Sequence, residues 1–135
     1  THPGERDGID MPRWALLTAR LILAVVVVMI TVLSLRPDGP QTAGEMDKLA
    51  HAGAYLAVAL LLVLSIRPRP FTAGRLILII AAAAGYGLLI ELVQREVGRE
   101  FELADMIANA IGATVGAMAG LGVRRFVGSV GDAPD

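Results

Sequence analysis

Long apolar runs alternate with short polar segments along most of the chain. The runs cover residues 15–35, 49–66, 76–93 and 103–123. About 20 helical residues cross a hydrocarbon layer of about 30 Å, so each run is long enough to span a membrane. None of them alternates apolar with polar residues, as the strands of a transmembrane barrel do. The pattern therefore predicts an all-α, polytopic membrane protein built as a bundle of four transmembrane helices.

The segments between the runs contain residues that end helices. Each of RPDGPQTAGE, RPRPFTAGR and REVGREFE carries Pro or Gly. The first run is longer than the apolar core of a secretion signal, about 7 to 15 residues, and is expected to remain as an anchor. We expect one membrane domain at 14–124, between polar cytoplasmic tails at 1–13 and 125–135. Its helices are predicted at about 14–35, 47–66, 75–95 and 103–123.

The composition agrees with a membrane protein and excludes several classes of site. Of the 135 residues, 55% are hydrophobic and 19% are charged, which is too apolar for an ordinary soluble domain of this length. A net charge of -1 gives no field that would attract nucleic acid. The absence of cysteine excludes disulfides, thiolate metal sites and cysteine nucleophiles.

The basic residues are divided unevenly between the two sides of the predicted membrane. Eight of the twelve fall on one side: Arg6, Arg13, Arg20, Arg67, Arg69, Arg75, Arg124 and Arg125. The other side has Arg36, Lys48, Arg95 and Arg99. Because cytoplasmic loops hold the excess of Lys and Arg, both termini are expected in the cytoplasm, with the protein in the bacterial inner membrane.

Polar residues within the spans gather at the ends that this topology places outside. They are Asp47, Lys48, His51, Tyr55, Glu91, Gln94, Arg99, Asp105 and Asn109. Residues four apart share a helical face, so Asp47, His51 and Tyr55 form one stripe and Asp105 and Asn109 another. An ionisable group facing lipid costs about 2.5–3.5 kcal/mol at the bilayer centre. We therefore expect these polar faces to meet inside the bundle.

Small residues also recur at intervals of four. The last run contains Ala104, Ala108, Gly112, Gly116 and Gly120, a groove along which another helix can approach closely. Ala81 and Gly85 predict a similar surface in the third run. The Gly112, Gly116 and Gly120 face is also the surface through which we would expect a homo-oligomer to form.

The ordered set of polar motifs resembles the VanZ-like family of small membrane proteins. The matching elements are DKLAHAGAY at 47–55, ELVQ at 91–94, GR at 98–99 and DMIANAIGATVG at 105–116. Together with the glycine at 120 they cover residues 47–120, most of the chain. The chain departs from the usual family pattern at Ala52 and Val97, which affects the shape of the site more than its charges.

This resemblance implies work at the outer surface of the membrane, on or beside envelope lipids or cell-wall precursors. Proteins of this family are linked to lowered susceptibility to glycopeptide antibiotics such as teicoplanin. The resemblance supplies no reaction, so three classes of function stay open. They are binding of an anionic lipid or precursor head group, intramembrane hydrolysis or transfer at a lipid-linked phosphate, and export by a dimer.

Each class assigns different roles to the same residues. In a binding protein Lys48 and Arg99 would hold the anionic group, while in an enzyme His51 or Glu91 would act as general base, oriented by Asp47. Ordinary structural roles compete with both: capping by the aspartates, interface anchoring by the cations, and interhelical hydrogen bonds from Gln94 and Asn109. Tyr55 is also typical of a packed aromatic.

A metal site is not expected. His51, Glu91 and Asp105 would be its ligands, but no short spacing such as HxxxH supports one. Neither a metal nor a cofactor is therefore predicted, and the partners are membrane lipids or a cell-wall precursor.

The topology has a direct test, since the chain has no native cysteine. Single cysteines at Gly44 and Gly98 should react with an impermeant thiol reagent added outside intact cells, whereas one at Thr72 should react only after permeabilisation. Labelling of Thr72 from outside, with Gly44 protected, would reverse the orientation.

Overall fold

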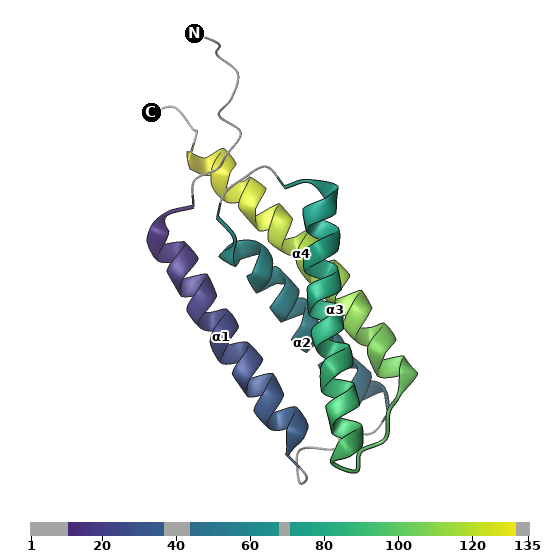
Figure 1. Cartoon of the computed structure of the whole chain (residues 1–135). Helices are drawn as coiled ribbons and strands as arrows, with labels where there is room; N and C mark the ends of the chain where they lie inside the picture. The colour runs from purple at the N-terminus through teal and green to yellow at the C-terminus, as the bar shows by residue number, and fades with distance from the viewer. Residues whose placement is uncertain (1–10, 37–43, 68–70, 132–135) are drawn as a thin grey trace.

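The structure, a computed structural model, is a bundle of four helices. It describes residues 11–36, 44–67 and 71–131. Its helices are α1 (Arg13–Leu35), α2 (Glu45–Ser65), α3 (Ala73–Glu96) and α4 (Leu103–Gly131), and no strand occurs in those ranges. The helices run alternately in opposite directions, so α1 begins and α4 ends at the same end of the bundle (Figure 1). All four are long and apolar enough to cross a membrane, which confirms the predicted all-α fold of four apolar helices.

The predicted helix boundaries are accurate to about two residues except at the end of α4. This helix continues to Gly131, eight residues beyond the predicted 123, so Arg124 and Arg125 belong to it. The end of an apolar run marks where a helix can leave lipid, and a helix without proline can continue into water. The segment after 123 contains no proline before position 134.

Large apolar side chains cover the outside of the bundle, and some charged ones are buried inside it. In α1 only Leu16 and Ala19 are buried, whereas Leu17, Leu21, Val25 and Val28 are more than half exposed. Glu91, Asp105 and Arg124 are buried. A surface this apolar is typical of contact with lipid, where buried polar groups pair with one another.

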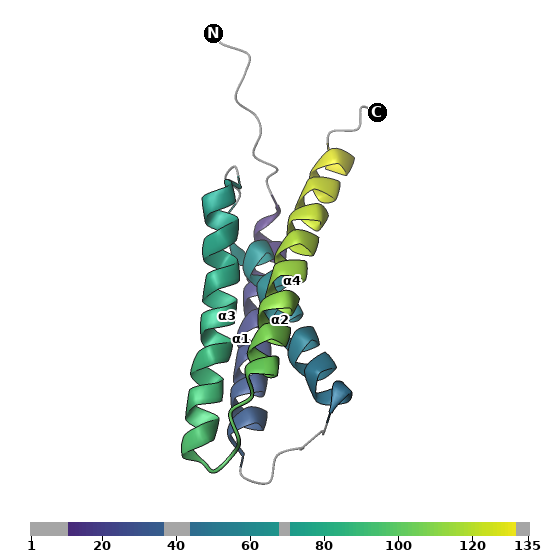
Figure 2. The same cartoon turned by 90° about the vertical axis from the view of Figure 1, so that its right-hand side faces the viewer.

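The closest helix contact is between α2 and α4, which lie side by side (Figure 2). A Cβ atom on Gly112 would overlap the carbonyl oxygen of Ala52, and one on Gly116 would overlap that of Leu56. At Gly120 it would lie 2.8 Å from Cβ of Val63. The glycine groove predicted for 112–120 therefore exists, and α2 of the same chain occupies it.

Two predictions about small residues change with this contact. Because α2 fills the face of Gly112, Gly116 and Gly120, a homo-oligomer would have to use another surface. The surface predicted from Ala81 and Gly85 is wrong, since both are exposed and a Cβ on Gly85 would meet nothing within 4 Å. The helix α3 instead packs through Ala83 and Gly87, two positions further along. Spacing gives a face its period but does not decide which of several small faces turns inward.

Two arginines hold the C-terminal end of α2. One guanidinium nitrogen of Arg124 donates to the carbonyl oxygens of Val63 and Ile66, both at 2.8 Å. Nε of Arg20 donates to the carbonyl of Ser65 at 3.0 Å. The last carbonyls of a helix have no partner within it and carry partial negative charge, so cations stabilise them. We call this the arginine end of the bundle, and the opposite end, with Glu45 and Leu103, the site end.

Gly116→Ala tests the α2–α4 contact. The added methyl meets backbone atoms of Leu56, which cannot rotate away, so we expect the free energy of unfolding in detergent to fall by about 1–3 kcal/mol or more. Gly122→Ala is the matched control, because its Cβ would meet nothing within 4 Å and alanine favours helix. Equal stability of the two variants would contradict the close approach.

Candidate functional site

The polar faces of α2, α3 and α4 meet at the site end, with His51 at their centre. Nε2 of His51 lies 4.0 Å from Oδ2 of Asp47 and 3.7 Å from Oδ2 of Asp105. Nδ1 lies 3.1 Å from Oδ1 of Asn109 and 3.9 Å from Oε1 of Glu91. One imidazole therefore contacts groups from three helices, and the predicted meeting of the polar faces is confirmed.

Most of this cluster is shielded from the surroundings. Glu91 is 2% exposed, Asn109 1% and Asp105 5%, and Gln94 is also buried. The imidazole and Asp47 are partly exposed and border the cavity described below. Carboxylates buried to this degree need positive charge or hydrogen-bond donors close by, so the groups around His51 depend on one another.

The two aspartates occupy the first turns of their helices, Asp47 in α2 and Asp105 in α4. A carboxylate there interacts favourably with the helix dipole, as the capping interpretation requires. That interpretation is incomplete for Asp105, because its Oδ1 atom is buried without a hydrogen-bond partner. Its other oxygen faces the imidazole. The Asp105 carboxylate is thus directed into the cluster.

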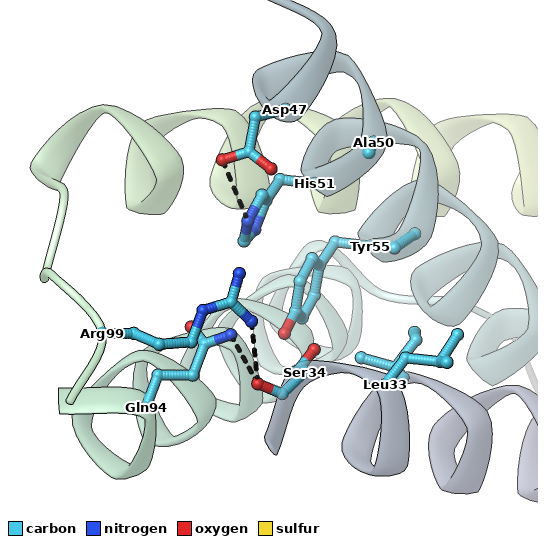
Figure 3. A pocket seen from close by; sticks show the side chains of 10 residues that line it. Leu33, Ser34, Asp47, Ala50, His51, Tyr55, Gln94 and Arg99 are labelled. Atoms are coloured by element: carbon cyan, nitrogen blue, oxygen red, sulfur yellow. Dashed lines mark hydrogen bonds and ion pairs between the residues drawn. The ribbon is translucent and has the colours of Figure 1, made fainter. Parts of the chain in front are cut away.

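Arg99 and Gln94 reach across the bundle to the end of α1. The carbonyl oxygen of Ser34 accepts from Nε2 of Gln94 at 2.9 Å and from a guanidinium nitrogen of Arg99 at 3.1 Å (Figure 3). The turn that directs Arg99 depends on Gly98, whose φ of 86° is in the left-handed region. The amide of Arg99 then donates to the carbonyl of Gln94 at 3.0 Å, which closes the end of α3.

A cavity of about 260 Å³ lies beside the cluster, between α1 and the polar stripe of α2. Figure 3 shows Asp47 and His51 on one side of it and Arg99, Gln94 and Ser34 on the other. Its polar lining is Ser34, Asp47, His51, Tyr55, Gln94 and Arg99, and its apolar lining is Ile30, Leu33, Ala50 and Ala54. The cavity is therefore amphipathic, with a cation at one wall.

Lys48 does not line this cavity. It borders a separate, mostly apolar groove of about 510 Å³ between the first turns of α2 and α4, together with Glu45, Ala104 and Ile107. The two cations that we expected to hold one head group, Lys48 and Arg99, thus line different spaces. Lys48 belongs to α2 and Arg99 to the loop after α3, and α2 lies between the two spaces that they line. The sequence order does not reveal this separation.

Tyr55 is a packed aromatic residue as well as part of the cavity wall. It is buried, and its ring centroid lies 5.8 Å from that of Tyr86. The hydroxyl of Tyr86 contacts Oγ1 of Thr31 at 2.7 Å, and it donates to the carbonyl of Val27 at 3.1 Å. This chain of contacts fixes α1 against α3 below the cavity.

Four residues with specific contacts were missed from the sequence. Ser34 acts through its carbonyl oxygen, which no sequence pattern marks. Thr31 and Tyr86 lie in apolar runs and gave no motif. Arg124 had a usable signal, because it follows Gly120 by four residues and so belongs to the stripe that contacts α2.

Comparisons of this chain with family models, with curated proteins and with solved structures give no match. The resemblance to the VanZ-like family therefore stays a prediction that rests on the motifs themselves.

Gly98→Ala tests the turn that positions Arg99. No atom would lie within 4 Å of the new Cβ, so the cost comes from the left-handed backbone alone, about 1–2 kcal/mol in the free energy of unfolding. Gly98→Asn should lose less, because asparagine tolerates this conformation. If Gly98→Ala matched Gly53→Ala, a helical control with equally open space, the turn would not have this role.

Proposed function

We propose that this chain is a multi-pass protein of the bacterial cytoplasmic membrane that binds an anionic lipid, or a lipid-linked cell-wall precursor, by its head group. Both termini lie in the cytoplasm and the site end lies at the outer face. The observation that carries the proposal is the amphipathic cavity, which combines an apolar wall from α1 and α2 with the Arg99 guanidinium. An anionic lipid likewise joins an apolar chain to a negatively charged head group.

The placement of Arg99 supports an anionic guest. A guanidinium has five N–H donors, and the contact with Ser34 engages one of its three nitrogens. Arginine binds phosphate through paired donors, so the contact with α1 holds the side chain in place while leaving its phosphate-binding chemistry intact. Gln94 and Tyr55 add neutral polar groups to the same cavity.

The apolar wall supports a guest that enters from the membrane. Ile30 and Leu33 come from α1, whose outward face is apolar along its length. An acyl or polyprenyl chain can lie along such a face while its head group reaches the polar lining. A role in glycopeptide susceptibility, as the resemblance to the VanZ-like family implies, would follow from sequestering or presenting a cell-wall precursor.

A second candidate is an intramembrane hydrolase or transferase that acts on a lipid-linked phosphate. The specific observation in its favour is the imidazole of His51, which borders the cavity while carboxylates and Asn109 surround it. An imidazole held in this way is suited to general acid–base work, with His51 or Glu91 as the base and water as the attacking group.

Arg99→Ala tests head-group binding. We expect it to weaken the binding of a polyprenyl phosphate by about 10- to 100-fold, the value of a charged hydrogen bond of about 1.5–3 kcal/mol. Arg95→Ala is the matched control, because Arg95 is an exposed arginine at the same end. Native mass spectrometry of the detergent-solubilised protein measures both, and equal binding by the two variants would contradict the proposal.

His51→Ala separates the two candidate functions. A binding protein should retain much of its affinity for the polyprenyl phosphate and its glycopeptide phenotype. An enzyme that transfers protons through His51 should instead lose about 10²- to 10⁴-fold in phosphate release or transfer while still binding the lipid. Unchanged binding, turnover and phenotype in both Arg99→Ala and His51→Ala would leave the cluster with a structural role only.

A further inference from the structure

We propose that Asp47, His51 and Asp105 bind one divalent transition-metal ion of the Zn²⁺ type between the first two turns of α2 and the first turn of α4. The proposal rests on the contacts of these three residues and does not depend on head-group binding. One carboxylate oxygen from each aspartate and one imidazole nitrogen lie within 4.8 Å of one another.

The separations fit a shared metal ion better than a shared proton. A charge-assisted hydrogen bond from a protonated imidazole to a carboxylate is about 2.7–2.9 Å long. Here Nε2 lies 3.7 Å from Asp105 and 4.0 Å from Asp47, which is too far for such a bond to either. Two ligands of one tetrahedral Zn²⁺, each about 2.1 Å from the ion, lie about 3.4 Å apart. The two nitrogen–oxygen distances exceed that value by about 0.3 and 0.6 Å, and all three ligand atoms lie within 4.8 Å of one another.

The contacts of the other ring nitrogen point to the same conclusion. The Oδ1 atom of Asn109 can only accept, so Nδ1 of His51 carries a proton and donates to it at 3.1 Å. In the neutral ring Nε2 then has its lone pair available to the side of the ring that the carboxylate oxygens of Asp47 and Asp105 approach. Histidine ligands of metals are held in this way, with one nitrogen on the metal and the other donating to a fixed acceptor.

Asp105 provides an independent sign of a missing partner. Its side chain is more than nine-tenths buried, and its Oδ1 atom has no hydrogen-bond partner. A buried carboxylate oxygen without a donor is strongly destabilising unless a cation compensates it. A metal ion between the aspartates would supply that charge, and a carboxylate can turn or bind through both oxygens to reach it.

The donor set indicates the class of ion. One imidazole and two carboxylates suit Zn²⁺, Mn²⁺ or Fe²⁺, whereas Mg²⁺ and Ca²⁺ prefer oxygen ligands alone. Three protein ligands leave at least one coordination position open. Because Asp47 and His51 also border the cavity, that position can face it. If the proposed head-group binding holds, the ion would attract the same anionic group as Arg99.

The histidine content of the chain permits a direct spectroscopic test. The only other histidine is His2, so His2→Ala makes His51 the sole imidazole. In full-length protein with ¹⁵N-labelled histidine, solubilised without lipid additives, Zn²⁺ alone should shift the Nε2 resonance while Nδ1 stays protonated. Metal analysis after gel filtration should give one Zn²⁺ per chain.

Variants assign the ligands in the same background. Asp105→Asn and His51→Gln should each weaken Zn²⁺ binding by at least 10-fold, and Asn109→Ala should weaken it by about 10- to 100-fold through the imidazole. Glu96→Gln is the matched control, since it removes an exposed carboxylate at the same end. Circular dichroism and gel filtration confirm that each variant folds.

The outcomes separate this proposal from the proposed function. Zn²⁺ binding that Asp105→Asn weakens and Glu96→Gln does not would support the metal site, whether or not polyprenyl phosphate binds. No stoichiometric Zn²⁺, a shift at Nδ1 in place of Nε2, or equal affinity in Asp105→Asn and Glu96→Gln would overturn it. Polyprenyl phosphate binding that persists in the presence of EDTA would leave head-group binding standing without the metal.

Discussion

The backbone contact between α2 and α4 is the constraint on which the rest of the structure depends. Carbonyl oxygens of α2 lie where the side chains of Gly112 and Gly116 would otherwise be, so the two helices approach as closely as backbones can. At that distance short polar side chains on the facing turns can touch, and His51 reaches Asp105 and Asn109 directly. Larger residues in the glycine stripe would push the two helices apart, and His51 would then lose its contacts with Asp105 and Asn109.

The two ends of this helix pair meet the cost of buried polar groups in different ways. At the arginine end, Arg124 donates to carbonyl oxygens that the last turn of α2 leaves without partners. At the site end, the buried Oδ1 atom of Asp105 and Nδ2 atom of Asn109 have no hydrogen-bond partner. Polar groups that are fully paired stabilise a membrane bundle, whereas partly paired ones are typical of sites that bind or react. This contrast is why the site end carries the functional proposals.

The sequence predicts the fold well because the membrane simplifies the problem. Lipid imposes a minimum length on every span, and the apolar runs revealed all four helices and most of their ends. The stripe of Asp47, His51 and Tyr55 and the stripe of Asp105 and Asn109 also follow from helical periodicity alone. Their meeting could be expected because ionisable groups avoid lipid. The distance of 3.1 Å between Nδ1 of His51 and Oδ1 of Asn109 is that of a hydrogen bond between the two stripes.

Tertiary packing decided what the sequence could not. Whether Ala81 and Gly85 or Ala83 and Gly87 face inward depends on the rotation of α3, and its small residues are nearly continuous there. Lys48 and Arg99 have the same charge and the same expected depth, yet α2 lies between the spaces they line. The grouping of Asp47, His51 and Asp105 joins two helices that are far apart along the chain, so local ligand spacing carried no sign of it.

The repeat of the glycine stripe has a consequence for how the helix pair finds its alignment. Gly112, Gly116 and Gly120 recur every four residues, and so do the α2 residues Ala52, Leu56 and Leu60 that they contact. A shift of α4 by one turn, about 5.4 Å, would seat two of the three glycines on α2 again, so the stripe alone tolerates a ratchet between neighbouring registers. The polar stripes have the same spacing but a different residue type at each turn, so only one register places Asn109 beside Nδ1 of His51. The polar groups of the cluster thereby also select one register of the bundle.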